Sequence, residues 1–178
     1  MPENGRGPGA AAGPRAPESF EAFARASQKR LYRTAYLLCG DADTARDLTQ
    51  TTLAKLFQHW RKASRAENID AYAKTILSRT YLAEQRRRVR ERELHTPIAP
   101  AGPRDRTDLR LTLVDALAEL SPKARAIVVL RYWEDQAIDQ VAAQLRCHPG
   151  TVKSTCNRAL ARLRARLGDD VDFYLMEA

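Results

Sequence analysis

Cysteine is scarce in this sequence, and its three copies, Cys39, Cys147 and Cys156, show no pairing pattern. A disulfide framework is therefore not expected, and the composition fits a reducing compartment. Long apolar runs are also lacking. Stretches such as AIVVL are far too short to span a bilayer, and the start MPENGRGPGAAAGPRAP has no apolar core of the kind a secretory signal needs. We therefore expect a cytoplasmic protein that does not insert into a membrane.

Motifs that would carry catalysis are missing as well. The sequence contains no glycine-rich phosphate loop, no cluster of residues at metal-ligand spacing and no convincing pair of nucleophile and base. His59 and His95 each stand alone, which favours packing or solvation over catalysis. We expect a protein that is not an enzyme and that needs no cofactor and no metal.

Positive charge is what the sequence has in excess. Lys and Arg number 30 against 22 Asp and Glu, so the net charge is +8, and 24 of the 30 basic residues are Arg. The planar guanidinium group suits phosphates and guanine edges, although an arginine bias can also reflect genomic base composition. Part of the surface is therefore expected to bind a polyanion.

The apolar pattern indicates an all-α protein, because alternation of β-branched residues is absent and apolar residues recur at helical spacing. The segment HTPIAPAGPRDR holds three prolines and a glycine, which favours an extended linker. We predict two small helical domains joined by this Pro-rich linker: a bundle of three to four helices and a helix-turn-helix. The expected divisions are a disordered tail at 1–17, a first domain at 18–93, a linker at 94–107, a second domain at 108–168 and an acidic tail at 169–178.

Capping signals predict where the helices begin and end. A first helix should run from Ser19 to Gly40, and a second should start at Asp41 or Asp43 and reach about Lys62. A third should start at Asn68 or Asp70 and run into the basic stretch RRRVRERE. In the second domain, Ser121 followed by Pro122 is a typical helix start.

The corner QLRCHPG separates a short apolar-patterned helix from a long arginine-rich one. His148 can cap the second helix and Pro149 can open it, and this spacing is that of a helix-turn-helix. In such motifs the second helix lies in the DNA major groove. Two other interpretations are weaker: an amphipathic helix with a merely solvated arginine face, and a metal site at Cys147, His148 and Cys156, which lacks a fourth ligand.

The chain resembles a known family at this point. LSPKARAIVVLRYWED…IDQVAAQL…GTVKSTCNRALARLRARL resembles the promoter-reading region 4 of bacterial extracytoplasmic-function sigma factors. The segments FEAFARASQKRLYRTAYLLCGDADTARDLTQTTLAKLFQHW and AYAKTILSRTYLAEQRRRVRERE resemble region 2 of the same family, in particular its actinobacterial, SigE-like subgroup. The resemblance covers roughly residues 19–168. It implies an alternative sigma factor that binds core RNA polymerase and promoter DNA, and members of the family are often held inactive by an anti-sigma factor.

The resemblance also implies three sets of binding residues. Core polymerase would bind the second helix at Asp43, Asp47, Gln50 and Ala54. The −10 element would be bound by Arg65, Asn68, Tyr72, Arg79, Tyr81, Arg86, Arg87, Arg88 and Arg90, with some arginines paired to Glu84, Glu91 or Glu93. The −35 element would be bound by His148, Gly150, Thr151, Lys153, Ser154, Thr155, Asn157, Arg158 and Arg162.

Several positions depart from the family pattern. A Glu beside the polymerase-binding residues is Arg46 here, and an Asn near the −10 pocket is Arg79. In region 4 the turn glycine is Arg146, the capping Ser is His148 and an Arg of the recognition helix is Thr155. These changes indicate either an unusual promoter or weakened polymerase function. We also expect the acidic tail to fold back on the basic second domain.

Two other functions compete with the sigma factor. The departures favour a sigma-like regulator that binds polymerase or DNA without supporting initiation. The other alternative is an ordinary helix-turn-helix repressor with a dimerising or ligand-sensing first domain, but such a domain would not need the basic run after the third helix.

Overall fold

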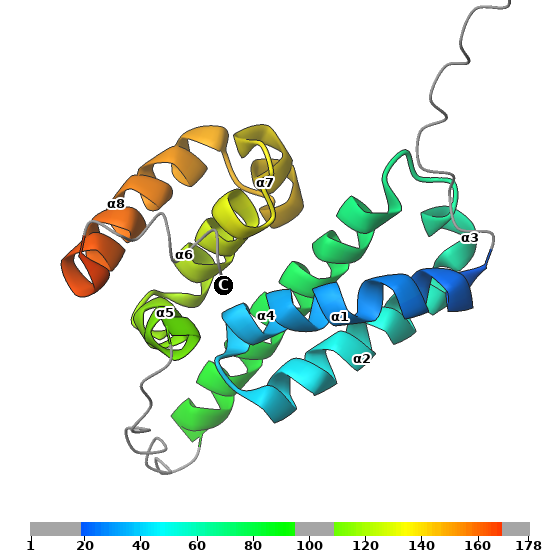
Figure 1. Cartoon of the computed structure of the whole chain (residues 1–178), viewed down its shortest axis with the longest axis horizontal. Helices are drawn as coiled ribbons and strands as arrows, with labels where there is room; N and C mark the ends of the chain where they lie inside the picture. The colour runs from blue at the N-terminus through cyan, green and yellow to red at the C-terminus, as the bar shows by residue number, and fades with distance from the viewer. Residues whose placement is uncertain (1–18, 95–108, 169–178) are drawn as a thin grey trace, which may run out of the picture.

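A computed structural model describes residues 19–94 and 109–168 (Figure 1). Within those two ranges every secondary-structure element is a helix and no strand is present, which confirms the predicted fold class. The elements are α1 (Phe20–Cys39), α2 (Ala42–Gln58), α3 (Trp60–Ala63), α4 (Ile69–Leu94), α5 (Leu109–Ala118), α6 (Pro122–Val128), the wide π-helical turn η1 (Val129–Trp133), α7 (Ile138–Leu145) and α8 (Pro149–Leu167). The expected N-terminal tail, nearly all of the linker and the acidic tail lie outside the described residues.

Local side-chain caps set most of the helix boundaries. Ser19 Oγ accepts from the amide of Ala22 at 3.2 Å, and Asp41 Oδ1 accepts from the amide of Thr44 at 2.8 Å. Between them Gly40 ends α1 with φ +69°, a left-handed conformation that costs glycine little. These starts and stops agree with the sequence. The second helix does not reach Lys62, however: it ends at Gln58, and the short α3 follows.

The N-terminal half, residues 19–94, is a bundle in which α1 packs on α2 and both pack on α4. In Figure 1 these helices form the blue-to-green group. Phe23, Leu31, Leu38, Leu56 and Leu77 are among its buried side chains. The bundle is therefore held by apolar stripes of the kind that the sequence pattern predicts.

The C-terminal half, residues 109–168, packs α5, α6 and α7 against α8. At the corner between α7 and α8, Arg146 takes a left-handed conformation with φ 51°. His148 Nδ1 then accepts from the amide of Gly150 at 3.0 Å and caps α8. The corner is thus a turn between two helices, as predicted, and it sets α7 and α8 in helix-turn-helix order.

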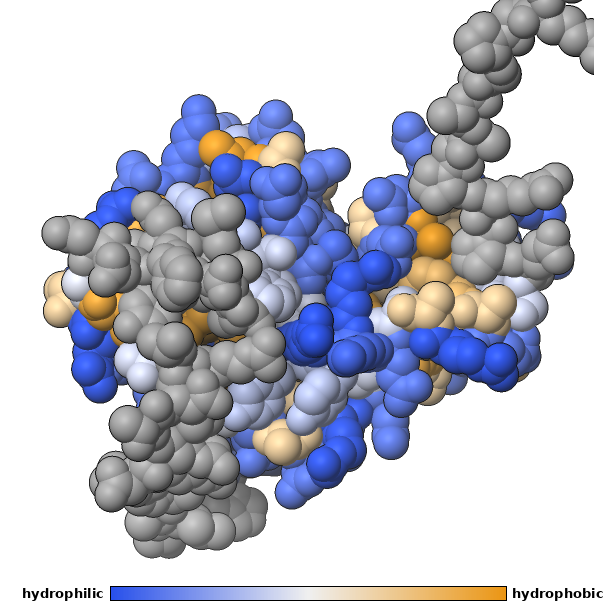
Figure 2. Space-filling model, in the orientation of Figure 1, coloured by the Kyte–Doolittle hydropathy of each residue, from blue (hydrophilic) through white to orange (hydrophobic). Residues whose placement is uncertain are grey.

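The two halves pack against each other. α1 contacts α5, α6 and η1, while α4 contacts α6 and α7. One buried apolar cluster runs through both halves and includes Leu38 and Tyr81 from the first and Leu113 and Leu117 from the second. The visible face in Figure 2 is mostly hydrophilic, as expected when the apolar stripes meet inside. None of the described helices is long and apolar enough to cross a membrane.

Candidate nucleic-acid and protein-binding surfaces

The outward face of α8 carries the residues predicted to bind the −35 element. All of them are exposed except Thr155, which is half-buried: the exposed set is His148, Gly150, Thr151, Lys153, Ser154, Asn157, Arg158 and Arg162. Thr155, Arg158 and Arg162 also line a shallow pocket of about 370 Å³, together with Ser121, which caps α6, and Lys123 of α6. A cationic helix face with small residues at its start can approach a DNA groove closely.

The inward face of α8 is apolar. Val152, Cys156, Leu160 and Leu163 are buried there. Burial raises the pKa of the Cys156 thiol above its ordinary value. Among the described residues no group of three or more His, Cys, Asp or Glu could hold a metal ion. The metal interpretation of this corner is therefore not supported, and Cys156 is a packing residue.

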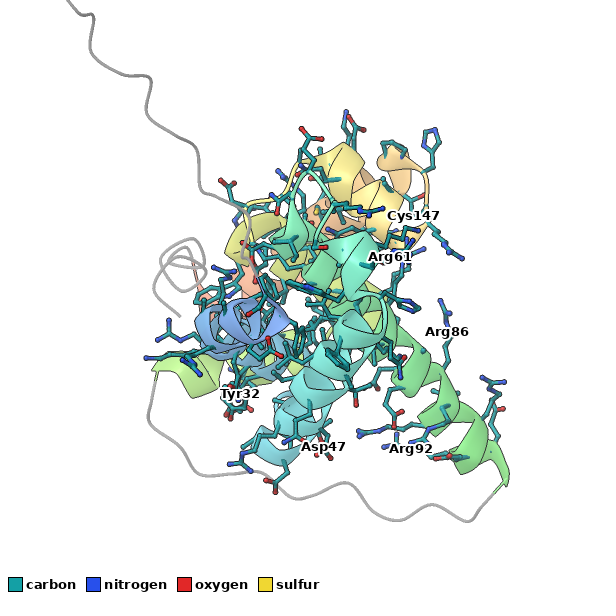
Figure 3. All side chains as sticks on the ribbon, turned by 90° about the vertical axis from the view of Figure 1, so that its right-hand side faces the viewer. Tyr32, Asp47, Arg61, Arg86, Arg92 and Cys147 are labelled. Carbon is teal, nitrogen blue, oxygen red and sulfur yellow. The ribbon has the colours of Figure 1, made fainter. Side chains whose placement is uncertain are left out.

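The predicted polymerase-binding strip lies along α2. Asp43, Asp47, Gln50 and Ala54 are all exposed, and Figure 3 shows Asp47 directed away from the bundle. Arg46 Nη1 bonds Asp43 Oδ1 at 2.5 Å, so part of the strip is already paired. The sequence did not indicate the basic side chains of α1 beside this strip. Arg25 and Lys29 line a cleft of about 550 Å³ with Arg46, Thr49 and Gln50.

The loop before α4 and the first turns of α4 hold three of the residues assigned to the −10 element. Arg65 and Asn68 are exposed, and Tyr72 is half-buried. Asn68 Oδ1 accepts from the amide of Ala71 at 2.9 Å, so its carbonyl oxygen caps α4. Its amide nitrogen is the part of the side chain that can still donate to a base.

Tyr81 requires a correction. Its side chain is 1% exposed, and burial raises its pKa to about 12. It belongs to the apolar cluster shared by the two halves, so in this arrangement it cannot contact DNA. The prediction that Tyr81 binds the −10 element is wrong for this conformation of the chain.

Arg79 occupies a position that the sequence did not indicate. Its Nε donates to the Gln144 carbonyl at 2.8 Å, and its Nη2 donates to the Ala143 carbonyl at 3.3 Å. Both carbonyls belong to the last turn of α7, where helix carbonyls lack partners within the helix. Arg79 therefore caps a helix of the opposite half instead of pointing freely into solvent.

The basic run of α4 is partly paired internally. Glu84 accepts from Arg87 at 2.7 Å and from Arg88 at 3.4 Å, and the bond from Arg87 is the largest cause that lowers the Glu84 pKa. Figure 3 shows Arg86 projecting away from the helix. Arg86 and Arg90 line a groove instead of pairing with Glu84.

That groove, about 920 Å³ in volume, separates the middle of α4 from the start of α6 and the end of α7. Five of its lining residues are basic and one is acidic: Arg79, Arg86, Arg90, Lys123, Arg146 and Glu93. Lys123 and Arg146 were not among the predicted site residues. An anionic backbone would find a favourable field in this groove.

A buried charged contact between the halves was also missed. Lys74 of α4 forms an ion pair with Glu134, the residue that follows η1, and Thr34 of α1 donates its hydroxyl to the same carboxylate. The side chains of Lys74 and Glu134 are 15% and 4% exposed. No local pattern links residues 60 to 100 positions apart, so sequence periodicity could not reveal this contact.

Comparisons with known proteins agree with this arrangement. Residues 23–91 match the family model described as Sigma-70 region 2, and residues 110–163 match Sigma-70, region 4. The RNA polymerase sigma-E factor of Streptomyces coelicolor is 39% identical over 163 residues, which cover 89% of this chain and 92% of that protein. The ECF RNA polymerase sigma factor SigL of Mycobacterium tuberculosis is 32% identical over 146 residues, covering 77% and 82%.

A solved structure resembles the whole described arrangement. The sigma factor RpoE of Bartonella quintana, crystallised in complex with the anti-sigma factor NepR, superposes with a TM-score of 0.68 at 29% identity. The match covers 85% of this chain and 98% of that one. Matching family models lie in both halves, and they occur in the order region 2 then region 4. The chain belongs to the sigma-70 family, in its extracytoplasmic-function (ECF) group, and it is an alternative sigma factor that directs promoter recognition.

Proposed function

We propose that this sigma factor binds core RNA polymerase through the exposed strip of α2, binds the −35 element through the outward face of α8 and binds the −10 element through α4. Such a protein works in the cytoplasm, where the polymerase is, and does so without catalysing a reaction itself. The two functional domains would correspond to 18–93 and 108–168. The observation that carries the proposal is that α8, the second helix of a helix-turn-helix, has an exposed cationic face.

The −35 contact follows from the first half of α8. Asn157 and Arg158 lie on the outward face and can bond base edges or phosphates, while Lys153 is placed to take a phosphate. Thr155 cannot make the bidentate guanine contact that an Arg there would make, so we expect weaker discrimination at one base pair.

The polymerase contact follows from charge. Asp47 and Gln50 present a carboxylate and an amide on an exposed helix face, and both can bond a basic partner surface. Arg46, Arg25 and Lys29 lie next to them and would receive an acidic group of the partner. An anti-sigma factor is a further expected partner, because the similar RpoE was crystallised with one.

Run-off transcription tests the proposal. Purified core polymerase is incubated with genomic promoter fragments, with and without the full chain. Transcripts that depend on the chain are expected. They should be lost with Asp47→Arg, through weaker binding to core polymerase, and with Asn157→Ala, through weaker binding to the −35 duplex. Glu21→Arg, an exposed charge reversal on α1 outside the three proposed surfaces, is the matched control and should transcribe normally.

The alternative is a sigma-like regulator that does not support initiation. The pairing of Arg46 with Asp43 within the α2 strip favours it, because a residue bound within the chain has less to offer a partner. Binding to core polymerase without transcripts from any fragment would support this alternative. Arg46→Glu and Arg79→Asn would then be the first changes to test for restored transcription.

A further inference from the structure

The groove between α4, α6 and α7 has an apolar floor, which neither nucleic acid nor polymerase accounts for in the proposal above. We use this name for Leu82 and Val89 of α4, Pro122 of α6 and Leu145 of α7. Val89 is 52% exposed, a large fraction for an apolar side chain that lines a groove. An exposed apolar surface with a polar rim is typical of a site that binds another molecule or segment.

The same groove holds a buried amide oxygen without a partner. Gln144 of α7 lines the groove and is 8% exposed, and its Oε1 accepts no hydrogen bond from the described residues. An unpaired acceptor away from water is costly. A ligand that brings an N–H donor, such as a polypeptide backbone, would therefore be stabilised here.

Positive charge extends from the groove to α8. The groove shares Ser121 and Lys123 with the neighbouring pocket, in which Arg158 and Arg162 of α8 add two cations. The basic surface is therefore continuous from the middle of α8 to the apolar floor. A segment that fits this surface must carry several negative charges beside an apolar run.

The residues that follow α8 have this composition. The tail, residues 169–178, reads DDVDFYLMEA. Three of its first four residues are Asp, the apolar run FYLM comes next, and a Glu follows; the tail contains no basic residue. Acidic and apolar residues thus occur in the order in which the surface presents cations and then apolar side chains.

The tail is long enough to reach the groove. α8 ends at Leu167, and Arg158 lies about 14 Å back along the helix axis, since a helix rises about 1.5 Å per residue. Five extended residues span about 17 Å. Residues 169–173 therefore suffice to pass Arg158 and approach Lys123, and the next five can lie in the groove.

We propose that the groove is a binding site for the tail, so that the chain carries its own acidic, apolar ligand. The aspartates of the tail pair with Lys123 and with the two arginines of the neighbouring pocket. The apolar run covers the apolar floor, and a backbone amide of the run donates to Gln144 Oε1. This binding does not require that α4 or α8 contacts DNA, so it goes beyond the proposed function.

Photocrosslinking of the full chain tests the site. The variant Tyr174→p-benzoylphenylalanine places a photoreactive group in the apolar run, and Leu175→p-benzoylphenylalanine places it one residue further along. Each purified chain is irradiated at low concentration, and mass spectrometry locates the adducts. We expect adducts within one chain, on the residues of the apolar floor.

Two charge reversals in the groove provide the comparison. Lys123→Glu and Arg146→Glu are combined in the photoreactive chain, and neither residue is assigned to DNA or polymerase. The yield of groove adducts should fall about threefold, as for a bound population that falls from about nine tenths to about one third. The matched control combines Arg25→Glu with Lys29→Glu in the cleft between α1 and α2, and it should leave the yield unchanged. Far-UV circular dichroism checks the helices, and glutamine replaces glutamate at both groove positions if they are lost.

The proposal is overturned if the adducts lie outside the groove, for example on α8 alone or in the cleft between α1 and α2. Adducts that join two copies of the chain would also overturn it, because the occupant would then be a second molecule. Equal yields from the parent and from the groove variant would show that the cations do not hold the tail. Absence of run-off transcription would contradict the proposed function and would leave the expected adducts unchanged.

Discussion

Arg125 of α6 joins two helix ends, and its replacement should be among the most destabilising single changes to a charged residue in this chain. Its Nη1 donates to the Leu38 carbonyl at 2.7 Å and its Nε to the Leu117 carbonyl at 2.8 Å. Its Nη2 donates to the Ala118 carbonyl at 2.9 Å and to the Leu120 carbonyl at 3.4 Å. One guanidinium group thus satisfies the end of α1 and the end of α5.

The expected cost follows from the carbonyls left behind. A hydrogen bond from a charged donor contributes about 1.5–3 kcal/mol, and a buried carbonyl without a partner costs about 1–3 kcal/mol. Arg125 is half-buried, so water can reach part of the site and the lower values apply. We expect Arg125→Leu to lower the free energy of unfolding by about 3 kcal/mol. In a chain of this length that corresponds to a fall in Tm of about 6–12 °C.

Two further variants separate bonding from charge. Arg125→Lys keeps the cation near both helix ends, but a single ammonium group cannot donate to carbonyls on several sides, so about half of the loss should remain. Arg33→Leu replaces an exposed arginine of α1 and should cost less than about 0.5 kcal/mol. Urea and thermal unfolding followed by circular dichroism measure all three. A loss below about 1 kcal/mol for Arg125→Leu, or full stability of Arg125→Lys, would refute this reasoning.

Three other predictions concern single positions. Arg158→Ala should weaken binding to a −35 duplex about tenfold more than Arg166→Ala, because Arg158 lies on the exposed face of α8 while Arg166 bonds Glu119 at 3.1 Å. Equal losses of affinity in a binding titration would contradict the docking orientation. Arg146→Gly should raise the free energy of unfolding by about 0.5–1 kcal/mol, since Arg146 has φ 51°, and a lower Tm would contradict this. Burial raises the pKa of Cys39 to about 11 from 9.0, so the folded state holds the thiol proton more tightly than the unfolded chain does. The resulting contribution to the free energy of unfolding is fully present below about pH 9. As pH rises through the folded pKa of about 11, this stability, on the order of 2 kcal/mol, should be lost, and in Cys39→Ala that part of the pH dependence should vanish in urea titrations.

Much of the fold could be predicted because its signals are local. Ser19, Gly40 and Asp41 act within four residues of their partners, and the Ser121–Pro122 start of α6 is equally short in range. The break after Gln58 escaped prediction because the apolar pattern continues through it. We attribute the break to tertiary packing, because the Trp60 ring, just after the break, packs edge-on against the ring of Phe20 with centroids 5.5 Å apart.

The site was predictable in its exposed parts and not in its buried ones. Periodicity placed the residues proposed to bind the −35 element on the outer face of α8, because that helix has one covered side. α4 is covered on more than one side, since it contacts α1 and α2 as well as α6 and α7. The family resemblance assigned Tyr81 to the −10 element, and the structure buries it. The Lys74–Glu134 pair joins the halves across 60 positions, a separation at which one sequence carries no pairing signal.

The position of Arg79 bears on why it differs from the family pattern. The sequence alone allowed either an altered promoter or a loss of polymerase function, because an Asn is usual near the −10 pocket. In the structure the guanidinium group spans from α4 to the last turn of α7 and bonds two carbonyls there. An Asn side chain is several bonds shorter and has one amide nitrogen, so it could not hold both carbonyls from the same backbone position. Arg79 thus strengthens the contact between the halves in a way that the usual residue cannot. The contact between the halves therefore gives Arg79 a structural role that does not depend on the promoter sequence.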